Sequence, residues 1–283
     1  MNVVNNITAL NHILEDFRLK NLKIGFVPTM GALHQGHASL ITKALKENEV
    51  VVCSIFVNPK QFNDKDDLIN YPRTPEADII LLENLGCQIL FAPSVEEMYP
   101  FEITGKEKPA YDLGGLDKIM EGFYRPGHFQ GVALVVHRLF ELVRPQRAYF
   151  GTKDYQQVAI IRKLTSDLQL PIEIISCPTL RDSDGVAMSS RNKNLSPKAR
   201  KMAAHIPRIL NLAREKAGLL SVNELKHWVE NEINKTNFLT LDYFELADAQ
   251  SLTPLQKLNP KGNNVGCIAV FAQKVRLIDN IIL

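Results

Sequence analysis

Two histidines three residues apart, His34 and His37, follow an apolar segment that ends in a glycine-containing turn. The run from Phe26 onward is typical of a buried strand, a turn and then a helix, which the pattern predicts from about Ala38. Backbone N–H groups in the first turn of a helix lack partners within the helix and carry partial positive charge, so they attract phosphate. Imidazoles at this spacing lie on one face of a helix and can share a proton near neutral pH. The turn therefore predicts a nucleotide phosphate site.

The histidine pair is also compatible with two alternative roles. One histidine could pack in the core while the other caps the helix, or the pair could bind zinc. Zinc needs further ligands, and no carboxylate or thiolate follows nearby at ligand spacing. Gly31 and Gly36 favour phosphate, because glycine lets the backbone approach a ligand without a Cβ in between.

A second candidate segment runs from Gly151 to Gln157, directly after another apolar stretch. Lys153 would neutralise a phosphate there, and Asp154 would accept hydrogen bonds from ribose hydroxyls. Gln157, at the start of the next predicted helix, would point back toward the same crevice. The alternative is a solvent-exposed Lys–Asp pair that caps a helix.

Two further polar segments offer ligand groups. Residues Met188–Asn192 place two hydroxyls before a guanidinium, which makes a compact anion site. This site lies in a polar, turn-rich stretch over 178–195, which is either a flap over a triphosphate or an ordinary exposed loop. Residues Asn58–Phe62 follow a predicted strand and either present amide groups to a small polar ligand or simply end that strand.

Several well-known signatures are absent from the sequence. It contains neither a G-x-x-x-x-G-K-[ST] loop nor a G-x-G-x-x-G turn, which disfavours P-loop NTPases and NAD-binding Rossmann enzymes. A serine nucleophile elbow is also missing.

The elements that must position these groups alternate between strands and helices. This alternation predicts an α/β fold with a Rossmann-like, doubly wound parallel sheet, in which ligands bind beyond the carboxyl ends of the strands. The predicted strands are 23–28, 50–57, 88–92, 147–151 and 171–176. The predicted helices are 8–20, 38–47, 74–85, 130–143 and 154–168.

The pattern changes after Cys177, where we place a boundary between a domain of residues 1–177 and a smaller one of residues 178–283. Ser196 and Pro197 predict the start of a helix that continues to about Lys216. The second domain is therefore predicted to be α+β, with helices at 196–216 and 221–235 and strands at 240–247, 265–272 and 274–279.

Length and composition are those of an ordinary enzyme with two domains, at 283 residues and a net charge of +2. This charge is too small to indicate a nucleic-acid partner. The four cysteines stand singly, without zinc or disulfide spacing, and predict a reducing, cytoplasmic location. Neither a secretory signal nor a membrane-spanning stretch is expected.

Taken together, the motifs resemble those of the pantoate–β-alanine ligase family over nearly the whole chain. Individually several are weak, but their common order is specific. The matching segments are Pro28–His34 with Gly36 and His37, Asn58 and Pro59 with Gln61 and Phe62, Tyr71–Thr74, Arg125–Phe129, Gly151 with Lys153 and Asp154, and Met188–Asn192.

The resemblance implies a His-x-Gly-His nucleotidyltransferase fold and an ATP- and Mg²⁺-dependent condensation of (R)-pantoate with β-alanine. The products would be pantothenate, AMP and diphosphate, formed through a pantoyl adenylate by a homodimer. His37 would be the catalytic residue. Pantoate would bind Gln61 and Gln157, and β-alanine would bind Gln61. The residues implied to bind ATP are Met30, Gly31, Ala32, Leu33, His34, Gln35, Gly36, His37, Gly151, Thr152, Lys153, Asp154, Leu180, Met188, Ser189, Ser190 and Arg191.

One residue departs from the family pattern, and three rival functions stay open. Thr152 stands where family members often carry a longer polar residue before the lysine. The first rival is a cytidylyl- or adenylyltransferase that leaves its nucleotide on the product. The others are a shortened tRNA synthetase relative and an ATP-binding regulator without catalysis.

Overall fold

The computed structural model describes residues 1–100, 110–260 and 262–283. They divide into two compact units, one of residues 1–151 with 160–177 and one of residues 152–159 with 178–283. Helix α9 (Tyr155–Asp167) contributes residues to both units.

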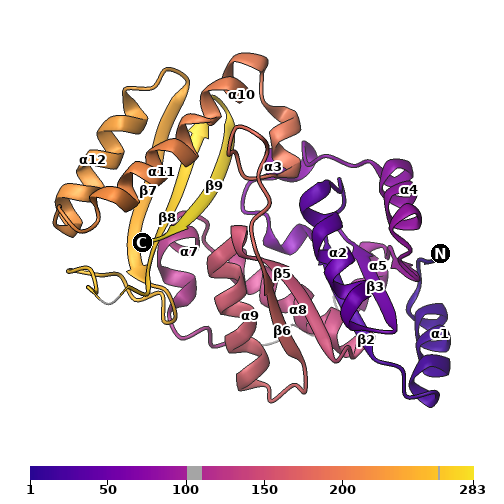
Figure 1. Cartoon of the computed structure of the whole chain (residues 1–283). Coiled ribbons are helices and arrows are strands. Elements are labelled where there is room, and N and C mark those ends of the chain that lie inside the picture. Colours follow the sequence, from indigo (N-terminus) through magenta and orange to yellow (C-terminus); the bar gives the residue numbers. More distant parts are fainter. Residues whose placement is uncertain (101–109, 261) are drawn as a thin grey trace. The chain divides into compact units, whose positions relative to one another are not determined.

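The first unit is built on a six-stranded sheet in the order β1-β4-β3-β2-β5-β6, and all of its strand pairs are parallel. Strands β3, β2, β5 and β6 are labelled in Figure 1. The order reverses between β2 and β5, which makes their carboxyl ends the expected ligand-binding edge. The strands are β1 (Asn2–Val4), β2 (Ile24–Thr29), β3 (Val50–Ile55), β4 (Ile89–Phe91), β5 (Arg147–Gly151) and β6 (Glu173–Cys177).

Helices cover both faces of this sheet because its strands are apolar on both sides. On one face, Val27, Val51 and Tyr149 pack in a cluster with α2 and α4. On the other face, the ring of Phe140 from α8 meets Phe26 and Phe150 edge to face. The helices and 3₁₀ turns of this unit are α1 (Ile7–Leu19), α2 (Gln35–Glu47), η1 (Pro59–Gln61), α3 (Lys65–Ile69), α4 (Pro75–Leu85), α5 (Val95–Met98), η2 (Leu116–Lys118), α7 (Met120–Tyr124) and α8 (His128–Val143).

The second unit packs three helices on a three-stranded antiparallel sheet, seen in orange and yellow in Figure 1. Its apolar core joins side chains such as Leu210, Leu225 and Ile268. The elements are η3 (Thr152–Asp154), η4 (Ser190–Asn194), α10 (Pro197–Ala203), α11 (His205–Lys216), α12 (Val222–Asn234), β7 (Leu239–Asp248), β8 (Asn264–Ala272) and β9 (Val275–Ile282).

The fold class predicted from the sequence is confirmed, but several elements differ locally, among them the short helices α3, α5 and α7, which were not predicted. The helix after β2 begins at Gln35 rather than Ala38. The helix predicted over 196–216 is two helices, α10 and α11, because Pro207 has no N–H to bond to Ala203 one turn earlier. Strand β1 was not predicted, since three residues carry too little periodicity.

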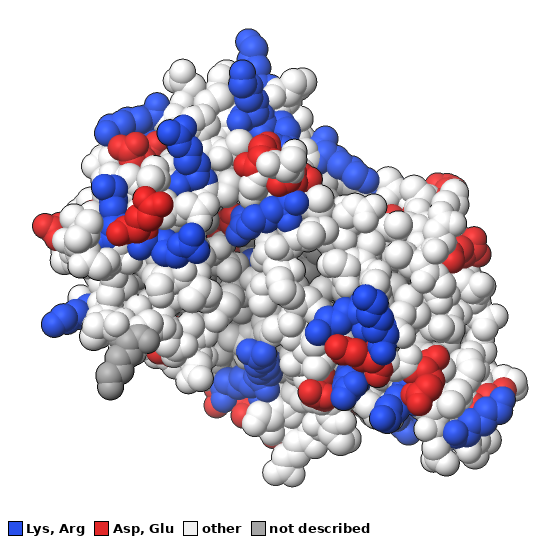
Figure 2. Space-filling view, viewed as in Figure 1, with Lys and Arg blue, Asp and Glu red and all other residues white. Residues whose placement is uncertain are grey.

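Charged side chains of both signs are interspersed on the face drawn in Figure 2. Within the described part of the chain, no helix has the length and apolarity needed to cross a membrane.

Candidate active site

The corner after β2 has a backbone that only particular residues tolerate. Gly31 has a φ of +79°, and a Cβ there would lie 2.9 Å from Ile55 Cγ2 and 3.1 Å from Asp78 Oδ2. Ala32 follows with a φ of +49°, which is unfavourable for a residue with a side chain. A conformation of this kind persists only where its surroundings enforce it.

Asp78 enforces it. This carboxylate is 2% exposed, and its two oxygens accept the N–H groups of Ala32 and Leu33, each at 2.8 Å. Thr74 Oγ1 donates to the same carboxylate at 3.0 Å. Asp78 lies one turn into α4, 45 residues along the chain from Leu33 in the corner that it braces, and sequence reasoning missed it. The one available signal was the Thr74–Pro75 helix start, which places a carboxylate on the inward face of α4.

Asp78→Asn is expected to lower the free energy of unfolding by about 2 kcal/mol. The asparagine NH₂ would face one of the two backbone N–H groups, which would be left buried without an acceptor. The matched control is Glu76→Gln, which neutralises an exposed carboxylate on the same helix and should change stability by less than about 0.5 kcal/mol. Urea unfolding of the three proteins measures the difference. Equal stabilities would contradict the bracing role of Asp78.

His34 and His37 are brought together at the start of α2, where each ring bonds a backbone N–H of the same turn. His34 is the N-cap, and its Nδ1 accepts the N–H of Gly36 at 3.1 Å. His37 is the third helical residue, and its Nδ1 accepts the N–H of His34 at 3.3 Å. The ring centroids are 4.1 Å apart. Helix capping, an alternative left open above, is thus a property of both histidines.

These bonds fix which ring nitrogen carries the proton. Because Nδ1 is the acceptor in both rings, the neutral form of each carries its hydrogen on Nε2. The sequence predicted that first-turn backbone N–H groups would bind phosphate, but the His34 side chain already accepts the N–H groups of Gly36 and His37. The Nε2–H groups are therefore the better candidates as donors to an anion near the positive end of α2.

The amide of Gln61 lies beside this corner. Its Nε2 donates to Met30 Sδ at 3.1 Å, and its Oε1 accepts from Asn58 Nδ2 at 3.1 Å. Asn58 is held in turn by Tyr99, whose hydroxyl donates to Asn58 Oδ1 at 2.7 Å. A thioether is a weak acceptor. The side-chain NH₂ group of Gln61 can therefore exchange this contact for a hydrogen bond to a carboxylate or hydroxyl of a ligand with little loss of free energy.

Two contacts hold the backbone of Gln61 against α8. Gly131 allows a very close approach, because a Cβ there would lie 2.1 Å from the Lys60 carbonyl oxygen. His128 Nδ1 lies 2.7 Å from the Gln61 carbonyl oxygen. The chain before Gln61 and the start of α8 are thereby fixed to each other.

The Lys153 segment belongs to the other unit, where Asn280 of β9 holds it. Asn280 Nδ2 donates to the carbonyl oxygens of Thr152 and Lys153, at 2.8 and 2.9 Å. The Thr152 hydroxyl lies 3.3 Å from that of Thr179, and Lys153 Nζ lies 3.4 Å from Asp154 Oδ1. Gln157 lies in the same unit, in the first turn of α9.

The polar stretch predicted over 178–195 is more ordered than a loop. Residues Arg181 and Ala187 form a β-bridge, and Met188 N–H donates to the Leu180 carbonyl. Ser189 caps the 3₁₀ turn η4, which contains Ser190 and Arg191, and Ser190 is buried.

Ion pairs brace the start of this stretch. Both Arg181 Nη atoms donate to Asp279 of β9, at 2.6 and 2.9 Å, and this pairing raises the pKa of Arg181. Arg200 bonds Asp182 and Asp184, and its hydrogen bonds hold the pKa of Asp184 below the ordinary value.

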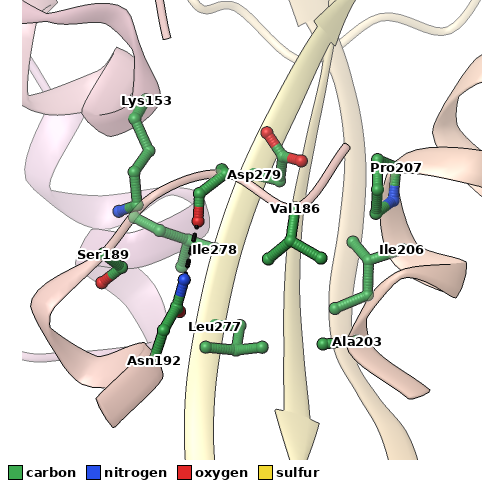
Figure 3. A pocket seen from close by; sticks show the side chains of 11 residues that line it. Lys153, Val186, Ser189, Asn192, Ala203, Ile206, Pro207, Leu277, Ile278 and Asp279 are labelled. Atoms are coloured by element: carbon green, nitrogen blue, oxygen red, sulfur yellow. Dashed lines mark hydrogen bonds between the residues drawn. The ribbon is translucent and has the colours of Figure 1, made fainter. Parts of the chain in front are cut away.

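A small cavity in the second unit adjoins some of these residues (Figure 3). Lys153, Ser189 and Asp279 line it together with apolar side chains of α10, α11 and β9. Its volume of about 20 Å³ is room for about one water molecule. It is therefore too small to be a nucleotide pocket.

A metal site made only of side chains is not found in the described part of the chain. Within residues 1–100, 110–260 and 262–283, no group of three or more His, Cys, Asp or Glu side chains is arranged to hold an ion. Mg²⁺ commonly uses substrate phosphates, waters and only one or two carboxylates.

The fold and the turn between β2 and α2 together define the class of protein. A parallel sheet with paired histidines at the start of the helix after β2, at the edge where the strand order reverses, is the arrangement of a His-x-Gly-His nucleotide-binding enzyme.

Comparison with known proteins identifies the family. The family model described as pantoate–β-alanine ligase matches residues 2–282. The chain is 48% identical over 281 residues to a pantothenate synthetase of Bacteroides fragilis, covering 99% of this chain and 98% of the relative. The chain belongs to the pantoate–β-alanine ligase family.

Solved structures agree with this assignment. The pantothenate synthetase of Thermus thermophilus matches with a TM-score of 0.91 and 43% identity, over 99% of both chains. The ligase of Francisella tularensis, solved with β-γ ATP and β-alanine, matches with a TM-score of 0.82 and 39% identity, over 100% of this chain and 97% of that one.

Proposed function

We propose that this ligase, which forms pantothenate in an ATP-dependent reaction, works through a pantoyl adenylate. In the first step the pantoate carboxylate attacks the α-phosphorus of ATP, and diphosphate leaves. In the second step the amine of β-alanine attacks the acyl carbon, forming the amide and releasing AMP. The observation that carries this proposal is that His34 and His37, at the positive end of α2, each accept a backbone N–H through Nδ1, from which we infer that each neutral ring carries its hydrogen on Nε2.

The first step needs positive charge, because a carboxylate must approach an anionic phosphate. We assign His37 as the catalytic residue that donates a hydrogen bond or proton to the phosphate oxygens as charge develops there. His34, Lys153 and Arg191 would bind the phosphates. The remaining residues proposed to contact ATP are Met30–Gly36, Gly151, Thr152, Asp154, Leu180 and Met188–Ser190.

Mg²⁺ is proposed to arrive bound to ATP. It would offset phosphate charge and stabilise the leaving diphosphate.

Gln61 and Gln157 are proposed to bind pantoate, and Gln61 also to face β-alanine. The Gln61–Met30 contact supports the first assignment, since it puts the amide beside the corner proposed for ATP. An acid held there would lie near the α-phosphate.

Two further proposals concern the protein in the cell. The family resemblance supports a homodimer, which sedimentation would test. The four free, buried cysteines of the described chain agree with a reducing cytoplasm, which cell fractionation would test.

The direct test is an assay of diphosphate release from ATP and pantoate, run with and without β-alanine and with and without Mg²⁺. An adenylate route predicts pantoate-dependent exchange of diphosphate into ATP without β-alanine, and AMP plus an amide once β-alanine is added. A stable nucleotidyl product would indicate a nucleotidyltransferase instead. Nucleotide binding without turnover would indicate a regulator.

Gln61→Ala is expected to raise KM for pantoate by about 10- to 100-fold, because one or two hydrogen bonds to the acid are lost. KM for ATP should change less than about threefold, and it serves as the control within the same experiment. Initial rates over both substrate concentrations give both constants. A larger effect on ATP than on pantoate would show that the acid pocket is misplaced.

A further inference from the structure

Two side chains contact the backbone carbonyl of Gln61. One comes from Arg125, just before α8, and the other from His128, the first residue of α8. His128 Nδ1 lies 2.7 Å from the Gln61 oxygen, and Arg125 Nη2 lies 3.4 Å from it. Arg125 Nη1 also lies 3.2 Å from His128 Nε2. Gln61 and His128 are each 7% exposed, so these contacts form largely away from water.

The partners fix the protonation of His128. A carbonyl oxygen only accepts hydrogen bonds, so Nδ1 must carry the proton that faces Gln61. A guanidinium only donates, so Nε2 must be the unprotonated acceptor of Arg125. His128 is therefore a neutral ring with its hydrogen on Nδ1, the opposite form from His34 and His37.

Charges around the ring favour this neutral form. A second proton on Nε2 would point at the Arg125 guanidinium, at 3.2 Å. Arg125 itself pairs with the largely buried carboxylate of Glu121, at 3.7 Å, and its Nε donates to Asn63 Oδ1 at 3.4 Å. The apolar ring of Phe129 packs beside His128, with centroids 4.8 Å apart.

The backbone hydrogen bonds that close the turn around Gln61 are weak, although the Asn58 side chain also caps this turn by accepting the Lys60 N–H at 3.2 Å. The 3₁₀ turn η1 closes through Gln61 N–H to Asn58 O at 3.4 Å and Phe62 N–H to Pro59 O at 3.3 Å, which are both long bonds. The His128 bond is much shorter. It fixes the peptide from which the Gln61 side chain extends toward Met30.

We propose that His128, kept in its Nδ1–H form by Arg125, is a positioning residue that holds Gln61 in place for the acid substrate. This inference rests on the proposed role of Gln61 in binding pantoate. His128 would act through the Gln61 peptide, so its loss should weaken pantoate binding and leave ATP binding nearly unchanged.

Two amide substitutions at His128 test the roles of its two ring nitrogens separately. His128→Asn places an NH₂ close to the position of Nδ1 and keeps the donor to Gln61. His128→Gln places its amide near Nε2 and removes that donor. We expect His128→Gln to raise KM for pantoate by about tenfold, as for the loss of one buried hydrogen bond, with KM for ATP within about twofold. His128→Asn should stay within about threefold of the parent for both substrates. Equal effects of the two variants, or a matching rise in KM for ATP, would overturn the proposal.

The unmodified protein offers a test that does not depend on the variants folding. Long-range ¹H–¹⁵N spectra of histidine rings distinguish the two neutral forms, and His128→Asn assigns the signal. We expect the Nδ1–H form for His128 at about pH 7.5, above the ordinary pKa of histidine. An Nε2–H or doubly protonated ring would overturn the proposal.

Gln61→Ala separates the role of Gln61 in binding pantoate from the positioning role of His128. If it leaves KM for pantoate unchanged, the assignment of Gln61 fails, and the role of His128 falls with it. If it raises KM for pantoate while His128→Gln does not, only the positioning role is overturned.

Discussion

His37→Asn is expected to slow pantoate-dependent diphosphate release by about a hundred- to a thousandfold, as for the loss of one donor to a charged transition state. Its stability should stay within about 0.5 kcal/mol of the parent protein. The asparagine Oδ1 can take the place of Nδ1 as acceptor of the His34 N–H, so the start of α2 keeps its capping bond. The Nε2–H group is lost, together with the ring contact to His34. Single-turnover rates together with urea unfolding measure the two effects.

His37→Gln is the matched control, because it places an amide near Nε2. A neutral donor is weaker than one that can become charged, so this variant should be slower than the parent by about tenfold. His37→Ala removes both functions and should also lose about 1 kcal/mol of stability with the cap. Equal rates for His37→Asn and the parent would remove His37 from the catalytic step.

Gly131→Ala is expected to lower the free energy of unfolding by about 3 kcal/mol, at the upper end of overpacking effects. The new Cβ would lie 2.1 Å from Lys60 O, 2.4 Å from Lys60 C and 2.7 Å from Gln61 N, which are backbone atoms with little freedom to move. Helix propensity alone predicts the opposite sign, since alanine is favoured over glycine inside a helix by about 1 kcal/mol. The sign of the change therefore decides between the two effects.

Gly218→Ala is the control for Gly131→Ala. A Cβ at Gly218 would meet no other side chain or backbone atom within 4 Å, and the φ of this residue is not positive. This variant should be neutral or slightly stabilising. Denaturant unfolding followed by both fluorescence and circular dichroism gives the comparison. A Gly131→Ala protein as stable as the parent would mean that η1 can move away from α8 freely.

Much of the fold was predictable because it depends on local pattern. Continuous apolar runs such as those of β2 and β3 indicate buried parallel strands, and Ser196 with Pro197 marks a helix start that the structure confirms. The break at Pro207 was also present in the sequence, but the apolar spacing continued across it and concealed it.

The candidate site was predictable only where its residues are neighbours in sequence. His34 and His37 form one turn, so their spacing identified them together. Asp78, Asn280 and His128 act through bonds to backbone groups 45 to 128 residues away, and a sequence carries no local signal for such a partner. The form of each histidine ring likewise follows from partners that only the folded chain brings together.

The hydrogen bonds from Asn280 to the carbonyls of residues 152 and 153 affect how this enzyme can be joined with its relatives in chimeric proteins. A chimera joined at position 177 would combine a lysine-bearing segment from one parent with a β9 strand from another. Because the acceptors are backbone carbonyls, the two hydrogen bonds would depend on whether that strand carries an amide donor at position 280. Exchanging residues 152–159 along with 178–283 would keep donor and acceptors from one ancestry. The structural unit that should be exchanged intact therefore consists of two separate segments of the sequence, residues 152–159 and residues 178–283.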